Sequence, residues 1–182
     1  DFSLSRVVTA GYAATELGDR GLLIVPIVMI TAVLLTPVLW GEEFGWRGYL
    51  QKRLFVGRPV RAAIATGLIW GVWHFPLTLR GYNYPDHPIV GSLMFTIFAV
   101  LIAYIFGWIR ERSGSIWASS LAHSATNTIG PLALLWLAGP QGPFVVSYGG
   151  LLAFPPLAIV CLCIFHAERR NSTYVERAAQ SS

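Results

Sequence analysis

The sequence predicts an all-α membrane protein, a polytopic helical bundle with about five transmembrane spans, and three observations support this class. Of the 182 residues, 54% are hydrophobic and only 12% are charged. The apolar runs are long enough to cross a bilayer, which takes about 20 helical residues. They are also continuous, whereas the strands of a membrane barrel alternate polar and apolar residues.

The apolar runs divide the chain into three regions. The predicted spans are residues 22–40, 62–80, 89–109, 115–137 and 144–165. We interpret residues 1–21 as an N-terminal polar or interfacial segment and residues 22–166 as the transmembrane core, which holds the candidate catalytic residues. We interpret residues 167–182 as a polar cytoplasmic tail, in which the stretch "NSTYVERAAQSS" after residue 170 is expected to be disordered.

The Lys and Arg residues alternate from loop to loop, and such residues collect on the cytoplasmic side of membrane proteins. One end of the predicted bundle holds Arg47, Lys52, Arg53, Arg58, Arg61, Arg110, Arg112, Arg169, Arg170 and Arg177. The other end holds Arg6, Arg20 and Arg80. This predicts a cytoplasmic C-terminus. The net charge of +4 is explained by this topology and by attraction to the lipid bilayer, so no nucleic acid partner is expected.

A few polar side chains lie within the apolar runs, where ionisable groups are costly and therefore mark functional candidates. They are Glu42, Glu43, Arg47, His74, His123 and Asn127. Residues four apart share one face of a helix, so Arg47 can neutralise Glu43. Glu42 lies about 100° around the helix from Glu43, so the two carboxylates cannot both face one small centre. His123 and Asn127 are also four apart and point the same way.

The depth of these residues can be estimated from helical rise. Glu42, His74 and His123 each lie roughly 16 to 19 Å from the nearest cytoplasmic arginine, at 1.5 Å per residue. For Glu42 this requires the first helix to continue through "RGYLQKR" to Arg53. If that helix ended at Trp40, the carboxylates would lie at the membrane interface. Because Glu42, His74 and His123 would then lie at similar depths, we expect the first helix to continue past Trp40.

A Glu, two His and an Asn at one depth suit hydrolysis of an amide. A carboxylate and an imidazole can hold and deprotonate a water, and a second imidazole with an amide NH₂ can stabilise an oxyanion. No Ser or Cys with an adjacent His and acid stands out, which argues against an acyl-enzyme. Glu42, His74 and His123 are also candidate ligands of a divalent metal such as zinc. The spacing does not decide between these two centres.

Three motifs carry a resemblance to a known family. "EEFGWR" at Glu42 to Arg47 is similar to the EExxxR motif of the CPBP family of intramembrane endopeptidases, which includes CAAX prenyl proteases and bacteriocin-processing enzymes and is also called the Abi family. "WGVWH" resembles its FxxxH motif, and "HSATN" resembles its third motif, a His followed four residues later by Asn or Asp. The resemblance covers roughly residues 25 to 165.

The resemblance implies a role for each matching position. Glu42 would be the general base that activates water together with His74. His123 and Asn127 would form the oxyanion site. Family members are described as metal-dependent by their motifs, whereas the eukaryotic prenyl protease suggests a glutamate-activated water with no tightly bound metal. The resemblance therefore leaves zinc open.

The resemblance also implies supporting residues, a larger fold and a location. Glu43 and Arg47 would support the site, and Trp70 stands where the second motif has Phe. The family commonly has about eight helices, so this segment is expected to be part of a larger eight-helix fold. The expected location is a bacterial or archaeal cell membrane with the catalytic side facing the cytoplasm. The expected substrate is a membrane-anchored peptide or protein.

Two other classes of function compete with a protease. A transporter or ion pathway would use buried Glu and His to relay protons or bind a cation. The sequence offers neither an inverted hydropathy repeat nor a second set of intramembrane acids for it. A noncatalytic scaffold would leave Glu42, His74 and His123 free to vary. A variant that folds but loses proteolysis distinguishes the protease from both.

Overall fold

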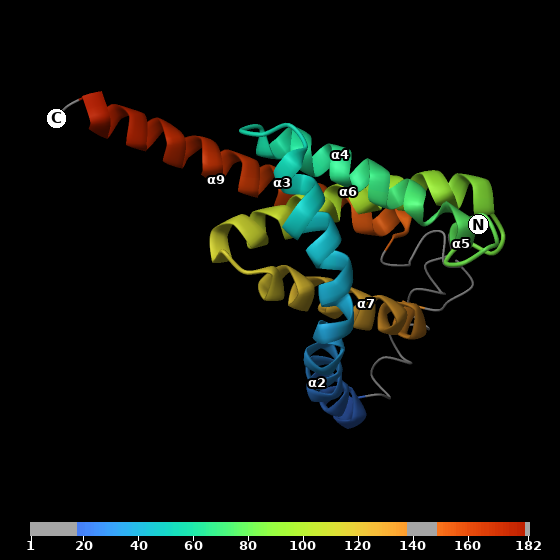
Figure 1. The fold of residues 1–182 in the computed structure, drawn as a ribbon. Helices are drawn as coiled ribbons and strands as arrows, with labels where there is room; N and C mark the ends of the chain where they lie inside the picture. The colour runs from blue at the N-terminus through green and yellow to red at the C-terminus, as the bar shows by residue number, and fades with distance from the viewer. Residues whose placement is uncertain (1–17, 138–148, 181–182) are drawn as a thin grey trace.

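The computed structural model describes the backbone of residues 18–137 and 149–180 and the side chains of residues 25–130 and 149–171. Within these residues the regular secondary structure is entirely helical (Figure 1). Its elements in order are α2 (Gly18–Glu43), η1 (Phe44–Leu50), α3 (Gln51–Arg53), α4 (Pro59–Trp73), α5 (Phe75–Thr78), α6 (Pro88–Ser113), α7 (Ile116–Leu137), η2 (Leu151–Ala153) and α9 (Phe154–Gln180).

The first helical segment extends well beyond residue 40. This agrees with the continuation to Arg53 that we expected from the similar depths of Glu42, His74 and His123. After α2, the chain forms a π-helix, η1, and then α3, so helical backbone continues to Arg53. A π turn widens the helix by one residue per turn and is frequent at functional sites. Counting Arg47 among the cytoplasmic loop cations was wrong, because this side chain is buried inside the bundle.

The second predicted span, 62–80, is broken at His74. α4 ends at Trp73, and the short α5 begins at Phe75 with Pro76 in its first turn. Pro has no backbone N–H and its ring clashes with the preceding turn, so α4 cannot continue through this point. The break places the His74 side chain at the end of α4.

α4 and α6 pack closely because α4 presents small residues at four-residue spacing. A Cβ on Gly67 would lie 2.5 Å from the Val100 Cα, and one on Gly71 would lie 2.7 Å from the Thr96 Cα. Small residues at this spacing allow membrane helices to approach backbone to backbone. The close contact brings Trp70, on the same face, against the aromatic core of α6.

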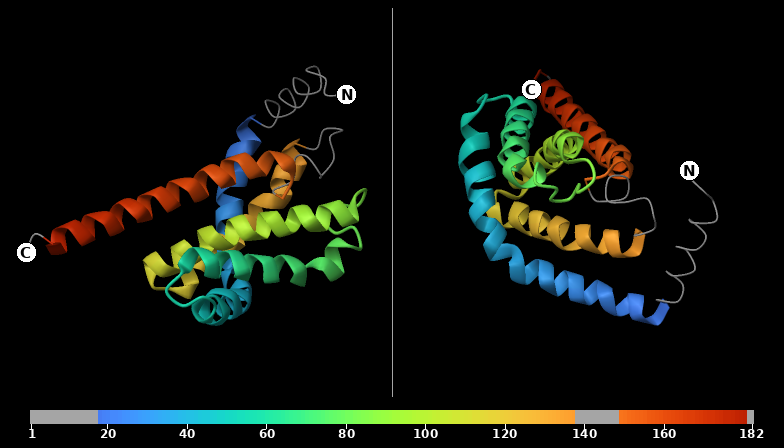
Figure 2. Two further views of the ribbon diagram at one scale, coloured as in Figure 1. Left: turned by 90° about the horizontal axis from the view of Figure 1, so that it is seen from above. Right: turned by 90° about the vertical axis from the view of Figure 1, so that its right-hand side faces the viewer.

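α6 ends at Gly114, which has a φ of 69° and donates its N–H to the Arg110 carbonyl. Glycine adopts this left-handed conformation without steric cost and so allows the chain to turn into α7. α7 then lies along α2 (Figure 2). Ser124 on α7 donates a 2.7 Å hydrogen bond to the Ala32 carbonyl on α2, which fixes the two helices together.

The last helix, α9, differs from the predicted span 144–165. Residues 144–148 lie outside the described residues, and α9 runs from Phe154 to Gln180. The prediction of a disordered tail was wrong, because helix continues through "NSTYVERAAQ". Glu, Arg, Ala and Gln in that stretch are good helix formers. α9 extends beyond the rest of the bundle (Figures 1 and 2).

The structure confirms the predicted class, a bundle of membrane helices. Three described segments are long and apolar enough to cross a bilayer, namely Val25–Arg53, Pro88–Ser113 and Leu151–Asn171. With 15 residues, α4 is shorter than a typical spanning helix of about 20. Of the N-terminal segment predicted at 1–21, residues 1–17 lie outside the described part of the chain.

Candidate active site

One cavity gathers the candidate residues from all three motifs. It has a volume of about 180 Å³, and Glu42, His74, His123 and Asn127 all line it. These side chains come from the end of α2, the end of α4 and the middle of α7. The structure therefore brings these four residues together around one cavity. Glu43 does not line the cavity, as its position 100° around the helix predicts.

Glu43 forms the centre of a buried charged cluster next to the cavity. Its side chain is 0% exposed, and its Oε1 accepts a 2.6 Å hydrogen bond from Arg47 Nη1. The same oxygen lies 3.0 Å from His123 Nδ1. A carboxylate can only accept, so Nδ1 carries a proton and donates it to Glu43. Glu43 thus holds both the arginine beside the cavity and a histidine that lines it.

The buried guanidinium of Arg47 is held by aromatic rings as well as by Glu43. Its Cζ lies 4.6 Å from the centre of a Trp70 ring and 5.1 Å from that of Phe106. A guanidinium over a ring face is attracted by the ring quadrupole, and more strongly when water is excluded. Nε and Nη2 have no hydrogen-bond partner among the described residues, so the rings and Glu43 hold the charge.

His74 is oriented by the carbonyl exposed at the end of α4. Its Nδ1 lies 2.8 Å from the Trp70 backbone oxygen, and a carbonyl oxygen can only accept, so Nδ1 is the donor. In the neutral ring this leaves Nε2 with a lone pair. The Phe95 ring packs against the imidazole with its centre 4.5 Å away. His74 is therefore a fixed ring with a basic nitrogen available to the cavity.

Glu42 differs from its neighbour in that no cation among the described residues forms an ion pair with it. Its side chain lines the cavity, and its Oε2 is buried without a hydrogen-bond partner among the described residues. Buried carboxylate oxygens are normally hydrogen-bonded, and a polar cavity can supply a water as the partner. The two adjacent glutamates thus occupy different environments, one paired with Arg47 and His123, the other facing the cavity.

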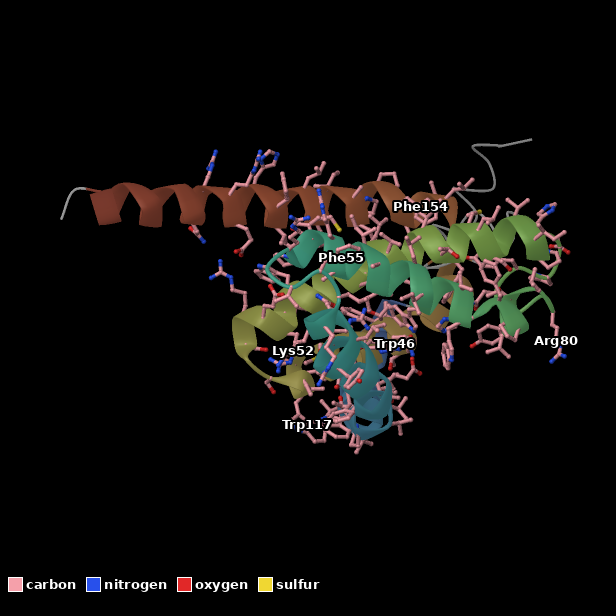
Figure 3. All side chains as sticks on the ribbon, turned by 45° about the horizontal axis from the view of Figure 1, so that its top comes forward. Trp46, Lys52, Phe55, Arg80, Trp117 and Phe154 are labelled. Carbon is pink, nitrogen blue, oxygen red and sulfur yellow. The ribbon has the colours of Figure 1, made fainter. Side chains whose placement is uncertain are left out.

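Trp70 connects the parts of the site, a role that sequence reasoning missed. Its ring lies edge-on to His123 at 5.1 Å and to His74 at 5.8 Å, in addition to its contact with Arg47. Trp46 from η1, labelled in Figure 3, also packs against Trp70, with ring centres 6.4 Å apart. The sequence signal that could have identified Trp70 is its place in "WGVWH", where the second motif, FxxxH, has its aromatic residue.

The remaining lining residues left no comparable signal in the sequence. Phe95 and Phe98 belong to the apolar run of α6, and Tyr82 and Asn83 belong to the loop that follows α5. Asn83 has a φ of 67°, a left-handed conformation that Asn tolerates better than most residues. This turn places the Tyr82–Asn83 pair at the cavity.

The candidate metal ligands do not form a metal site. Glu42, His74 and His123 line the same cavity, but the described residues contain no group of three His, Cys, Asp or Glu side chains close enough to hold one ion. In this arrangement the described donor set therefore does not fit a zinc centre, which needs several ligands around one ion.

The fold and the site together define a class: an integral membrane protein with a glutamate and two histidines around a cavity enclosed by its helices. The chain belongs to the family of type II CAAX prenyl endopeptidases described as Rce1-like, whose family model matches residues 22–129. The matched segment contains all three motifs. The family suggested by those motifs is thereby confirmed.

A curated relative supports the same assignment over a shorter segment. The chain is 43% identical over 47 residues to a protein of Methanococcus maripaludis named CAAX prenyl protease 2. That match covers 24% of this chain and 16% of the relative. No solved structure matches the chain.

Proposed function

We propose that the protein is an intramembrane endopeptidase that hydrolyses a peptide bond of a membrane-associated peptide or protein. The observation that carries the proposal is the single cavity lined by Glu42, His74, His123 and Asn127. The family, whose members are named as CAAX prenyl endopeptidases, supports the same class of reaction. Two of the helices that line the cavity, α2 and α6, belong to segments long and apolar enough to cross a bilayer, so we expect the substrate to approach from the membrane.

In this mechanism, Glu42 and His74 activate the attacking water. Glu42 Oε2, which has no hydrogen-bond partner among the described residues, accepts one hydrogen bond from the water, and His74 Nε2 accepts another. The Trp70 carbonyl holds His74 in the tautomer with a free Nε2. A positioned carboxylate and imidazole that remove a proton as the water attacks typically contribute about 10²- to 10⁴-fold to the rate.

His123 and Asn127 stabilise the oxyanion that forms as water adds to the peptide carbonyl. The Asn127 amide donates through its NH₂ group. His123 already donates Nδ1–H to Glu43, so it donates Nε2–H to the oxyanion only in its imidazolium form. Glu43 supplies the negative charge beside that imidazolium. Arg47 in turn holds Glu43 in position.

The test is proteolysis by the full-length protein in liposomes against membrane-anchored peptides. We expect Glu42→Gln, His74→Ala and His123→Ala each to lower cleavage by about 10² or more. His166→Ala serves as a matched histidine control, because His166 lies exposed on α9 and not in the cavity. Melting profiles must match the wild type, and a parallel assay with a strong chelator tests metal dependence directly.

Two results count against the proposal. If the three variants cleave as fast as the His166 control, the cavity is not the catalytic centre. If the wild type cleaves nothing while liposomes show an ion flux that Glu42→Gln abolishes, the protein is an ion pathway of the kind that the buried Glu and His also allow.

A further inference from the structure

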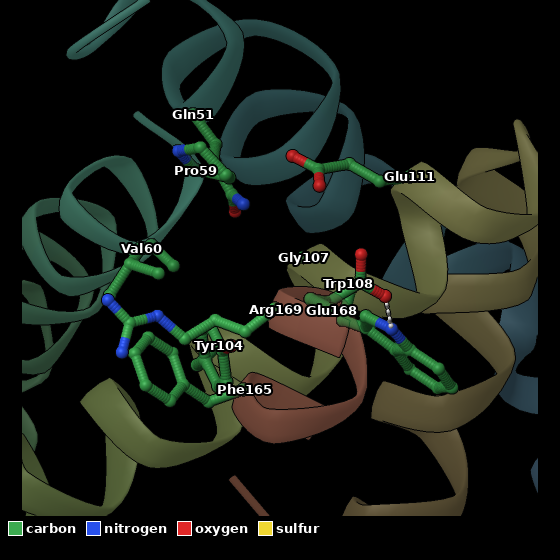
Figure 4. Close-up of a pocket in the computed structure, with 11 residues that line it drawn as sticks. Gln51, Pro59, Val60, Tyr104, Gly107, Trp108, Glu111, Phe165, Glu168 and Arg169 are labelled. Carbon is green, nitrogen blue, oxygen red and sulfur yellow. Dashed lines mark hydrogen bonds between the residues drawn. The ribbon is translucent and has the colours of Figure 1, made fainter. Parts of the chain in front are cut away.

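A second cavity lies at the opposite end of α4 and α6 from the candidate active site. It has a volume of about 290 Å³ and is formed by α3, the start of α4, the end of α6 and α9 (Figure 4). Val60 lines it, whereas His74, about 20 Å further along the helical path at 1.5 Å per residue, lines the candidate active site. The two cavities share no lining residue.

Two acceptor groups point into this cavity. The Gln51 side chain is only 8% exposed, and its Oε1 is buried without a hydrogen-bond partner among the described residues. Gly107 on α6 leaves room for this amide, since a Cβ there would clash with it. Glu111 directs its carboxylate into the cavity from α6 (Figure 4). An orphaned buried acceptor beside a carboxylate calls for a ligand that brings N–H donors.

The walls of the cavity suit a cation that carries those donors. Tyr104 and Trp108 line it, and aromatic faces attract organic ammonium groups. The third ring, Phe165, already has the Arg169 guanidinium 5.2 Å from its centre. The second carboxylate, Glu168, is already neutralised, because its Oε1 accepts hydrogen bonds from Trp108 Nε1 at 2.9 Å and Arg112 Nη2 at 2.6 Å. Glu111 is therefore the carboxylate available to a bound ammonium group.

The position of the cavity indicates that the ammonium belongs to a lipid. Its lining lies where α4 begins and α6 ends, at the level of Arg58, Arg61 and Arg110. Such cations mark the interface of membrane helices, where phospholipid headgroups lie. Arg169 lines the same cavity and can face a phosphate, and apolar side chains exposed on α4, such as Ile64 and Leu68, can face acyl chains.

The unsatisfied acceptor also discriminates between headgroups. Ethanolamine carries a primary ammonium with three N–H donors, whereas choline carries none. Only the former can satisfy Gln51 Oε1, and leaving a buried acceptor unpaired is costly. We propose that this cavity binds the headgroup of an ethanolamine phospholipid, with the ammonium between Gln51, Glu111 and the aromatic walls and the phosphate toward Arg169.

The test is lipid retention by the purified full-length protein, measured by native mass spectrometry during titration with phosphatidylethanolamine, phosphatidylcholine or phosphatidylglycerol. We expect the wild type to bind phosphatidylethanolamine about tenfold more tightly than phosphatidylcholine, and Glu111→Gln and Gln51→Leu each to remove about tenfold of that affinity. Asp86→Asn is the matched carboxylate control, because Asp86 is exposed in the loop at the other end of α4 and α6.

Three results overturn the proposal. The first is equal retention of phosphatidylethanolamine and phosphatidylcholine by the wild type. The second is unchanged retention in both Glu111→Gln and Gln51→Leu, each with a melting profile like that of the wild type. The third is displacement of the bound lipid by a lysine-containing peptide but not by O-phosphoethanolamine, which assigns the cavity to a peptide. His74→Ala is expected to retain the lipid, so the result is independent of the proposed protease activity.

Discussion

Two ion pairs in this protein have the same length and opposite surroundings. Arg47 and Glu43 approach to 2.6 Å with both side chains 0% exposed, and Arg112 and Glu168 approach to 2.6 Å with side chains 51% and 44% exposed. Removing two charges from water is costly, so the buried pair persists only because other groups help to hold it. His123 and the rings of Trp70 and Phe106 supply those contacts. The exposed pair needs no such surroundings, and solvent screens it.

The difference teaches that the length of an ion pair does not measure its importance. In the buried pair each partner is the main compensation for the other, so removing one leaves an uncompensated charge among helices. In the exposed pair either partner can be solvated when the other is removed. The comparison therefore predicts a steep ranking of mutational effects between the two regions.

The largest effect is expected for Arg47→Met. The substitution leaves the Glu43 charge buried with only His123 as a partner and should lower the free energy of unfolding by about 3–5 kcal/mol. The measurement is unfolding of the detergent-solubilised protein by a denaturing detergent. The double variant Glu43→Leu/Arg47→Met should lose less than the single variant, because both buried charges are gone. A loss below about 1 kcal/mol in Arg47→Met would contradict the comparison.

Glu43→Gln sharpens the comparison by separating stability from activity. The amide keeps the shape of Glu43 but lacks the negative charge beside His123, so we expect cleavage to fall by about 10²-fold. The measurement is the cleavage rate in liposomes. Glu168→Gln provides the matched control in the exposed pair and should cleave normally. Equal activity of the two variants would mean that Glu43 has no part in positioning His123.

Trp70→Phe should have an intermediate effect. Phenylalanine keeps an aromatic face for the Arg47 guanidinium but offers a smaller ring and leaves some space beside His123. We expect a loss of about 1 kcal/mol in the free energy of unfolding, measured in the same titration. A loss above about 3 kcal/mol would indicate that the indole contributes more than its ring face and volume.

The smallest effect is expected for Arg112→Ala. Exposed ion pairs contribute less than about 1 kcal/mol, and salt weakens them further. The free energy of unfolding should therefore change by less than that amount, and the change should shrink as ionic strength rises. A large decrease in the free energy of unfolding that does not depend on salt would contradict this prediction, because it would mean that the exposed pair stabilises the fold as strongly as the buried pair.

Local patterns predicted the parts of the site that depend on one helix. The four-residue spacing correctly paired Glu43 with Arg47, and the angle between adjacent residues correctly separated Glu42 from Glu43. The contact between Glu43 and His123 joins residues 80 positions apart, so no local spacing could predict it. The hydropathy pattern also predicted one continuous span over residues 62–80, so it did not indicate that the helix breaks at His74.

By itself, the sequence determined the all-helical membrane class, the approximate helices and the polar residues that belong together, because helical period and hydropathy are properties of neighbouring residues. Only the tertiary structure brought His123 to the Glu43–Arg47 pair and formed the cavity that Glu42 lines. It also created the cavity between α3, α4, α6 and α9, which Gln51 and Glu111 both line. The physical reason is that the sequence of one helix does not specify which neighbouring helix covers each of its faces. Packing between helices decides that.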